Sequence, residues 1–528
     1  MTYMALLGVV ALAGFISLSY EILWFRAFSF ASAGTPAIFG QLLFFYLVGL
    51  AVGAFVSRIF CQDRDATGDR RNLLPLAAFV YVANLLGFLV LPALAWFATT
   101  LLATGAMPLV AIAAGSWGAV LPLVSHFGIA PDALAGSRLS YLYLANILGS
   151  AAGTLLTGFV LLDRWTIGTA ALFVVLLGLA LAALVLARSA SGNRLKMLGM
   201  AVILLTAAAY AVETRRLFDR FYERLLAKHE YVPADPASLV VENRDGVILV
   251  TPALEVFGGG AYDGAISTSL ESDKNMIVRA YGVAALHPAP KEVLMIGLST
   301  GAWAQVIVNL PGVEKLTVIE INRGYLELIP RYPEVASLLR NPKVEIVIDD
   351  GRRWLAHHPE RTFDVVVSNT TFHWRANTTN LLSEEFLRAV RAHLKPGGIF
   401  HFNTTGSADA YKTAFTIFPY GLRFINFATV SDSPIEVNAE RWKRALDEHN
   451  IDGKPTLDST LALDRHRREA VLALVRTLNA PPIPYGLESR AHALPRLAGA
   501  RVITDDNMVP EWKGAHEVLF PPSAPEQH

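Results

Sequence analysis

The first 212 residues are almost continuously apolar, and this feature constrains the fold more than any other. A helix needs roughly 20 apolar residues to cross the hydrocarbon core of a bilayer. Seven stretches reach or approach that length, at about 3–25, 37–60, 73–96, 103–127, 139–162, 166–187 and 196–212. The last is the shortest, and as a helix lying along the membrane surface it would leave six spans. Residues 1–212 are therefore predicted to form a transmembrane helical bundle of six or seven spans.

The distribution of basic residues bears on the orientation of this bundle. Arginines and lysines cluster after the second and the sixth stretch, and by the positive-inside rule both loops face the cytoplasm. Seven spans would then put the rest of the chain outside, whereas six return it to the cytoplasm. We expect an integral protein of the inner (cell) membrane, in contact with the lipid bilayer, whose soluble domain is cytoplasmic.

Small residues recur within the apolar stretches. Gly49 with Gly53, and Gly149 with Gly153, form pairs four residues apart. Such pairs let helix backbones approach closely. We interpret them as packing positions, not as a site.

Charge and cysteine content exclude some classes of function. Lys+Arg and Asp+Glu number 45 each, so no overall positive field favours nucleic acid, and no nucleic-acid partner is expected. Cys61 is the only cysteine, which rules out a disulfide framework or a cysteine-based zinc site within the chain. No metal is expected.

The remainder of the chain has the pattern of a soluble α/β protein. Residues 213–238 form a charged, amphipathic linker, and a small β-hairpin follows at Leu239–Val241 and Val247–Val250. Short buried strands then alternate with helices, which predicts an α/β Rossmann-like domain of the class I S-adenosylmethionine-dependent transferase type over 239–430. Residues 431–528 are expected to be a helical and loop appendage. The predicted strands are 293–296, 316–319, 344–348, 364–367 and 399–403, and the predicted helices are 302–309 and 383–394.

Polar residues follow the predicted strands where open α/β sheets bind ligands. A turn with glycines at both ends follows the first strand, and Glu320 ends the second, about 20 residues on, where its carboxylate can bind two ribose hydroxyls. An acidic turn follows the third strand and can accept a hydrogen bond from an adenine amino group. The predicted cofactor-binding residues are Gly297, Ser299, Thr300 and Gly301 in the first turn, Glu320, and Asp349, Asp350 and Gly351 after the third strand.

Residues 239–430 resemble the spermidine synthases, the polyamine aminopropyltransferases. The resemblance rests on five segments in order, at 259–264, 293–301, 318–321, 348–351 and 363–368. The first apolar stretch, with 20–26, and residues 503–507 near the C-terminus look like membrane-fused members of that family. The resemblance implies N-terminal β-strands, a Rossmann-like core and decarboxylated S-adenosylmethionine as aminopropyl donor. Glu320 would hold the ribose and Asp350 the adenine.

The chain departs from the family pattern where the reaction needs acids. The family has an aspartate in the first turn, where this chain has Thr300, and two aspartates after the fourth strand, where it has Asn369 and approximately Phe372. The family's tyrosine ahead of the first Rossmann strand falls approximately at Ile277. Cationic nitrogens lose charge pairing when such carboxylates are absent. A standard polyamine acceptor is therefore not expected.

The loop after the fourth strand supplies the candidate catalytic residues. Asn369, His373 and Arg375 lie there, with His373 a base near neutral pH and Arg375 a bidentate partner for an anion. Each of these side chains also has an ordinary structural explanation, as a solvated or backbone-satisfying group. The predicted substrate-binding residues are Tyr262, Asp263 and Trp374.

Several functions remain open from the sequence. The first is a membrane-bound transferase that uses S-adenosylmethionine or its decarboxylated form as co-substrate. It would act on a small, membrane-borne acceptor by methyl or aminocarboxypropyl transfer, or cleave the donor to methylthioadenosine. The second is a conventional polyamine aminopropyltransferase. A third, of another class, is a nucleoside-binding transporter or sensor, and homo-oligomerisation is left open.

Overall fold

The protein is described from a computed structural model, in which residues 2–61, 73–234, 236–369, 372–458, 460–480, 486–507 and 510–512 are described. The contacts divide the chain into two compact units. One comprises Met1–Ala33 with Ala37–Val247, and the other Gly34–Pro36 with Ile248–His528. The predicted boundaries at 212, 238 and 430 remain predictions. Arg64, Arg70 and Arg71, on which the orientation argument partly rests, lie outside the described residues.

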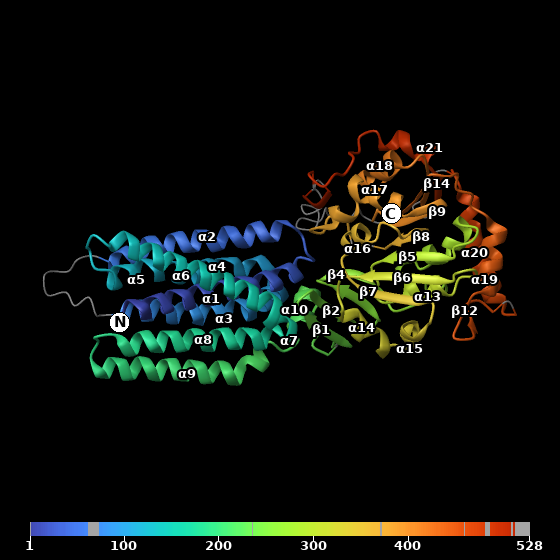
Figure 1. The fold of residues 1–528 in the computed structure, drawn as a ribbon. Helices are drawn as coiled ribbons and strands as arrows, with labels where there is room; N and C mark the ends of the chain where they lie inside the picture. Colours follow the sequence, from blue (N-terminus) through green and yellow to red (C-terminus); the bar gives the residue numbers. More distant parts are fainter. Residues whose placement is uncertain are drawn as a thin grey trace. The chain divides into compact units, whose positions relative to one another are not determined.

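The first unit is helical. Its described residues contain seven helical segments that are long and apolar enough to cross a membrane. The helix expected to be the weakest, α9 (Asn193–Leu217), has 25 residues and continues past the predicted end at 212, so length gives no reason to exclude it as a span. The other long helices are α1 (Tyr3–Ala31), α2 (Ala37–Ser57), α3 (Leu74–Thr100), α4 (Met107–Gly118), α5 (Val120–Gly128), α6 (Ala135–Leu156) and α8 (Ile167–Arg188), and Figure 1 shows them side by side.

The glycine pairs lie at the closest helix contacts of this unit. A Cβ placed on Gly49 or Gly53 of α2 would overlap the backbone of α4, at the carbonyl groups of Ala111 and Gly115. The second pair lies where α6 packs against α1, and a Cβ on Gly149 would overlap the carbonyl of Ala11. The absence of a side chain therefore sets the distance between these helix axes, as the spacing predicts.

We expect Gly53→Ala to destabilise the first unit, because its methyl group has no room against Gly115. Overpacking of this kind costs about 1–3 kcal/mol. Gly40→Ala is the matched control on the same helix, since nothing lies within 4 Å of a Cβ there. Thermal unfolding of the detergent-solubilised protein should show a lower midpoint for Gly53→Ala only. Equal midpoints would contradict this account of the packing.

The second unit is built on one mixed sheet of eight strands in the order β14-β10-β11-β9-β8-β5-β6-β7. The strands from β9 to β7 pair in parallel, and β11, β10 and β14 add antiparallel at one edge. This order confirms the Rossmann-type domain. The bounds are β5 (Glu292–Ile296), β6 (Lys315–Glu320), β7 (Val344–Ile348), β8 (Phe363–Ser368), β9 (Leu394–Asn403), β10 (Tyr420–Phe424), β11 (Phe427–Ser431) and β14 (Leu487–Ser489).

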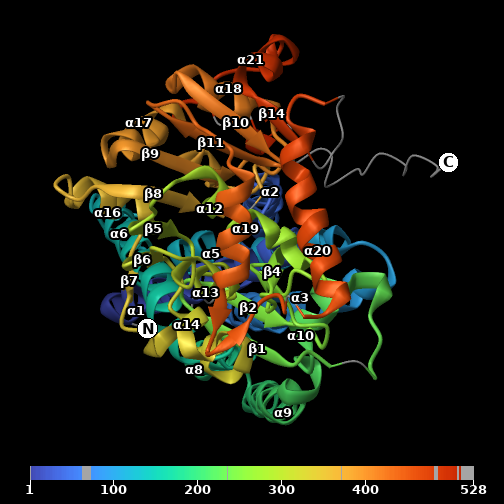
Figure 2. The same cartoon turned by 90° about the vertical axis from the view of Figure 1, so that its right-hand side faces the viewer.

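Helices cover this sheet. α16 (Gly351–His357), α17 (Glu384–Ala392) and α18 (Ala408–Ile417) share one buried core with its strands. Figure 2 shows α17 and α18 on one side of the strands and α19 (Ala439–Glu448) on the other. The remaining helices of more than four residues in the described part of this unit are α13 (Ala302–Val308), α14 (Gly324–Leu328) and α20 (Ala462–Ala473).

The strands before the main sheet are more numerous than predicted. β1 (Leu239–Asn243) and β2 (Gly246–Val250) coincide with the expected hairpin. β3 (Glu255–Gly258) and β4 (Ala261–Ala265) follow and pair antiparallel with β2 and with each other. Sequence reasoning missed these two strands because they are short and because each contains a glycine. Gly259 and Gly260 form their turn at positive φ, 56° and 82°.

Two of the predicted segments contain elements that the sequence did not lead us to expect. The segment 431–528 is not only helix and loop, because β14 completes the main sheet against β10 and β12 (Asn450–Ile451) pairs with β13 (Lys454–Pro455). In the predicted linker 213–238, α9 runs on to Leu217 before α10 (Phe221–Ala227) begins. Short strands with few apolar residues carry too little periodicity to be recognised.

Candidate functional site

The strand order places the candidate site. Along the parallel part of the sheet the chain runs outward from β5 to β6 and β7 on one side, and through β8 to β9 on the other, so the order reverses between β5 and β8. Ligands of open α/β sheets bind at the carboxyl ends of the strands beside such a reversal. Gly297 follows β5 there with φ 89°, a conformation that favours glycine. Among the described residues, a Cβ on Gly297 would have only the Asn369 carbonyl oxygen near it, 4.0 Å away. The backbone of this turn is therefore open to a ligand.

Glu320 ties the end of β6 to the turn after β5. One carboxylate oxygen accepts from the Leu298 amide at 2.7 Å and the Ser299 amide at 3.4 Å, and the other accepts from the Asn322 amide at 2.8 Å. The side chain is 4% exposed, and its burial raises the pKa of Glu320 to about 7. The residue predicted to hold a ribose thus also fixes the shape of the turn.

Two further hydrogen bonds hold the rest of the first turn. The Ser299 hydroxyl donates to the backbone carbonyl of Asp263 at 2.6 Å, which joins the turn to β4. Thr300 is 2% exposed, and its hydroxyl accepts from the Ala302 amide at 3.2 Å. Gly301 begins α13 with φ 79°, where a Cβ would press on Ile329. Thr300 and Gly301 shape the start of the helix.

The acidic turn after β7 adjoins the same edge. The Asp350 carboxylate caps α16 by accepting from the Arg353 amide at 2.8 Å, while Asp349 accepts from the Arg353 side chain at 2.6 Å. A Cβ on Gly351 would meet the side chain of Ile296 at 2.6 Å, so Gly351 allows α16 to pack closely on β5. The eight predicted cofactor residues therefore lie on the ends of three adjacent strands.

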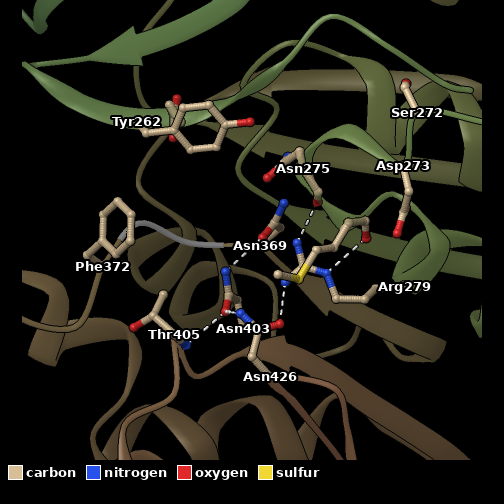
Figure 3. Close-up of a pocket in the computed structure, with 12 residues that line it drawn as sticks. Tyr262, Ser272, Asp273, Asn275, Arg279, Asn369, Phe372, Asn403, Thr405 and Asn426 are labelled. Carbon is tan, nitrogen blue, oxygen red and sulfur yellow. Dashed lines mark hydrogen bonds between the residues drawn. The ribbon is translucent and has the colours of Figure 1, made fainter. Parts of the chain in front are cut away.

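A cavity of about 620 Å³ lies on the side of this edge where β4, β8 and β9 end (Figure 3). Three of the predicted residues line it, namely Asn369, Tyr262 and Asp263. The other lining residues come from the segment after β4 and from α11 (Val278–Tyr281), which follows it. The rest come from the segments at the ends of β8 and β9 and from the β10–β11 turn. Together, these other lining residues are Ser272, Asp273, Asn275, Met276, Arg279, Phe372, Asn403, Thr405 and Asn426.

One wall of the cavity is a chain of amide groups (Figure 3). The Asn403 amide nitrogen donates to the Asn369 side-chain oxygen at 3.1 Å. Asn426 donates in turn to the Asn403 oxygen at 3.4 Å and accepts from Arg279 at 2.6 Å. This amide wall, defined as Asn369, Asn403, Asn426 and Arg279, carries no carboxylate.

Carboxylates lie elsewhere around the cavity. The Asp263 carboxylate accepts from the Tyr325 hydroxyl, and burial raises the pKa of Asp263 against the opposing effects of that bond and of Arg375. Asp273 accepts from the Val278 amide at 2.9 Å, and burial raises the pKa of Asp273. Both acids are thus held by neighbouring groups of the domain.

The candidate residues after Asn369 lie behind the cavity lining. The His373 ring nitrogen Nδ1 is 2.7 Å from the Thr405 hydroxyl, and the Trp374 ring stacks on Phe372 with the centroids 5.1 Å apart. Arg375 extends to Gly259, where a Cβ would touch its guanidinium. His373 and Trp374 therefore support lining residues, and Arg375 lies on the β3–β4 turn. Their assigned roles stay predictions.

Nine of the twelve lining residues were not among the predicted site residues, and four of these nine show why. Asn403 ends the predicted strand 399–403, so the rule that placed Asn369 at a strand end would also have found it. Thr405 follows two residues later. Asn426 and Arg279 carry no such signal, since one lies in an unpredicted strand turn and the other in a four-residue helix. Among the residues that the structure describes, no three His, Cys, Asp or Glu side chains gather as a metal ion would need.

Comparison with known proteins shows what this domain is similar to. Residues 272–414 match the family described as the spermine/spermidine synthase domain. The C-terminal domain is spermidine synthase-like. A polyamine aminopropyltransferase of Desulforudis audaxviator is 34% identical over 141 residues, which are 25% of this chain and 50% of that protein. Its counterpart in Caldicellulosiruptor bescii is 29% identical over 179 residues, 30% of this chain and 64% of that protein.

The chain thus spans between about half and two thirds of the length of these relatives. Among solved structures, the spermidine synthase of Thermotoga maritima covers 43% of this chain and 80% of its own, at 20% identity and a TM-score of 0.31. A spermidine synthase in complex with the transition state analogue AdoDATO has 20% identity and a TM-score of 0.32 over the same shares.

The position of Glu320 predicts a pH dependence of nucleoside binding. Its pKa of about 7 means that the ionised carboxylate, the better acceptor for ribose hydroxyls, forms as pH rises from 6 to 8. We expect the affinity for methylthioadenosine to rise about tenfold over that range. Isothermal titration calorimetry should show the rise in the parent protein and a flat, weaker profile in Glu320→Gln.

The same group sets the sign of a stability effect. The pKa of this carboxyl rises from 4.5 in the unfolded chain to about 7 in the fold. Its contribution to the stability of the ligand-free protein is therefore fully present below pH 4.5 and is lost as the pH rises through about 7. Glu320→Gln should remove this loss, whereas Glu345→Gln on the outer strand β7 should keep it.

A parent protein whose affinity does not change between pH 6 and 8 would contradict the assignment of the ribose to Glu320.

Proposed function

We propose that the protein is a membrane-embedded transferase that takes S-adenosylmethionine, intact or decarboxylated, as donor and transfers a group to an acceptor other than a standard polyamine. The observation that carries this proposal is the contrast between two neighbouring parts of the site. The residues predicted to bind a nucleoside lie together at the ends of β5, β6 and β7, whereas the adjoining cavity has the amide wall. A polyamine acceptor would need carboxylates in place of those amides. Seven apolar helices in the described residues support the membrane part of the proposal.

The residues at the edge fit an adenosyl donor. Gly297 leaves the backbone open, Glu320 offers carboxylate oxygens towards ribose hydroxyls, and the Asp349–Asp350 turn offers acceptors for an adenine amino group. When bound, the donor supplies a carbon activated by its sulfonium. The acceptor's nucleophile bonds to that carbon, and the carbon–sulfur electron pair stays on sulfur as a neutral thioether.

Asp263 is the group best placed to receive the acceptor's proton. It lines the cavity, and its own backbone carbonyl is bonded to Ser299 in the donor turn. Burial raises its pKa, which brings a carboxylate closer to the proton affinity that general-base catalysis needs. His373, the base expected from the sequence, has a ring nitrogen against Thr405 and does not line the cavity.

The amide wall supports the choice of acceptor class. A polyamine carries several ammonium groups, each best stabilised by a carboxylate when partly buried. Asn369 and Asn403 offer neutral amides, and Arg279 would repel an ammonium beside the β10–β11 turn. Conventional aminopropyl transfer is the second candidate, because the sequence relatives are polyamine aminopropyltransferases. In that reaction Asp263 and Asp273, which line the cavity, would pair with the ammonium groups of the polyamine.

The test is a turnover assay on the full-length protein in lipid nanodiscs with membrane extract. Each donor is supplied alone and with putrescine, and release of methylthioadenosine or S-adenosylhomocysteine is followed by mass spectrometry. We expect product without putrescine and no stimulation by it. Asp263→Asn should lower turnover at least about 100-fold while nucleoside affinity is kept, and Glu345→Gln should match the parent.

The outcomes separate the candidates. Turnover of decarboxylated donor only when putrescine is present would establish the conventional reaction and overturn our choice of acceptor. Binding of both donors with no product under any condition would overturn the transferase and favour a nucleoside-binding sensor. Recovery of the protein from the soluble fraction of cells would contradict the membrane embedding.

A further inference from the structure

Arg279, a buried cation, lines the cavity beside the β10–β11 turn, where its guanidinium bonds Asn426. Arg279 is 2% exposed and belongs to the short helix α11. Its guanidinium donates from Nε to the Met276 carbonyl at 3.0 Å, and from its two terminal nitrogens to the Asn275 carbonyl at 2.6 Å and the Asn426 side chain at 2.6 Å. Figure 3 shows these bonds at the cavity wall. All three acceptors are neutral, and two of the five N–H groups remain for a ligand.

The groups that accept hydrogen bonds from Arg279 carry no charge. Asp273 raises the pKa of Arg279 from further away, but its carboxylate accepts from the Val278 amide. The rings of Trp303 and Phe427 lie 5.2 and 4.5 Å from the guanidinium carbon. An arginine buried in this way costs free energy unless an anion joins it, and burial lowers the pKa of Arg279 to about 9.

The amide wall fixes where such an anion would lie. Asn369 stands at the donor end, since its carbonyl oxygen faces Gly297 in the donor turn. Asn403 and Asn426 follow in hydrogen-bonded order, and Arg279 closes the wall at the other end. In this order two asparagines lie between Asn369 and a negative group paired with Arg279. A second substrate whose nucleophile lies at Asn369 would extend along the wall to bring such a group to Arg279.

We propose that Arg279 binds a carboxylate of the acceptor, so that the second substrate is an amino acid-like compound with its nucleophile towards Asn369 and Asp263 and its carboxylate at Arg279. This assignment rests on the proposed transferase function and names its substrate class. The planar fork of the guanidinium matches a carboxylate, and the polar amides between the two ends suit a short chain with hydrogen-bonding groups.

The experiment compares two probes of equal length in the full-length protein saturated with methylthioadenosine. 4-Aminobutanoate and 1,4-diaminobutane share one amine and differ in whether the other end is a carboxylate or an ammonium. Calorimetry should show 4-aminobutanoate binding at least about tenfold more tightly, because a charge-assisted pair forms only with the carboxylate. Arg279→Gln should abolish the preference, and Arg279→Lys should retain part of it.

Controls separate the subsite from the fold and from the proposed function. Asn426→Asp places a carboxylate on the guanidinium without a change of size and should also abolish the preference. Unchanged methylthioadenosine affinity in each variant shows that the donor edge is intact. Equal binding of both probes, a preference for the diamine, or a preference that survives Arg279→Gln would overturn the carboxylate subsite while the transferase stands. Failure of methylthioadenosine itself to bind the parent protein would overturn both.

Discussion

The site depends on one buried carboxylate. Glu320, at the end of β6, accepts hydrogen bonds from the backbone amides of Leu298 and Ser299, and so holds the turn after β5 in the conformation that leaves its backbone exposed. Ser299 carries the constraint to Asp263 on β4, and Gly297 faces the Asn369 loop. The Glu320 side chain thereby connects the end of β6 directly to the turn after β5. Through Ser299 and Gly297, that turn contacts β4 and the loop that begins at Asn369. Loss of the Glu320 side chain would remove the donor site and the geometry of the cavity together.

The donor edge could be predicted from the sequence because its residues follow strands with clear periodicity. Glu320 and Asp350 each come directly after a short apolar run, and parallel strands bring their carboxyl ends to one edge. β3, β4 and β14 escaped prediction because they are short, and because β3 and β4 each contain a glycine. The amide wall escaped for a different reason. Asn426 and Arg279 are joined only by the tertiary fold, across 147 residues of sequence.

The same contrast bears on the loop after β8, whose predicted roles stay predictions. His373, Trp374 and Arg375 stand together in the sequence and carry suitable chemistry, but a loop of irregular backbone sends successive side chains in different directions. In the structure Thr405 and Phe372 line the cavity, with His373 and Trp374 behind them. The function proposed above therefore relies on Asp263 and the amide wall, which line the cavity, and not on His373 or Trp374.

The central claim is that the domain holds an adenosyl donor through Glu320, and the small molecules that copurify with the protein test it most directly. Mass spectrometry of the denatured full-length protein should release an adenosyl compound in near-stoichiometric amount from the parent and in traces from Glu320→Ala. The mass of that compound also distinguishes intact from decarboxylated donor. Absence of any adenosyl compound after incubation with both donors, or equal amounts from the parent and Glu320→Ala, would contradict the account.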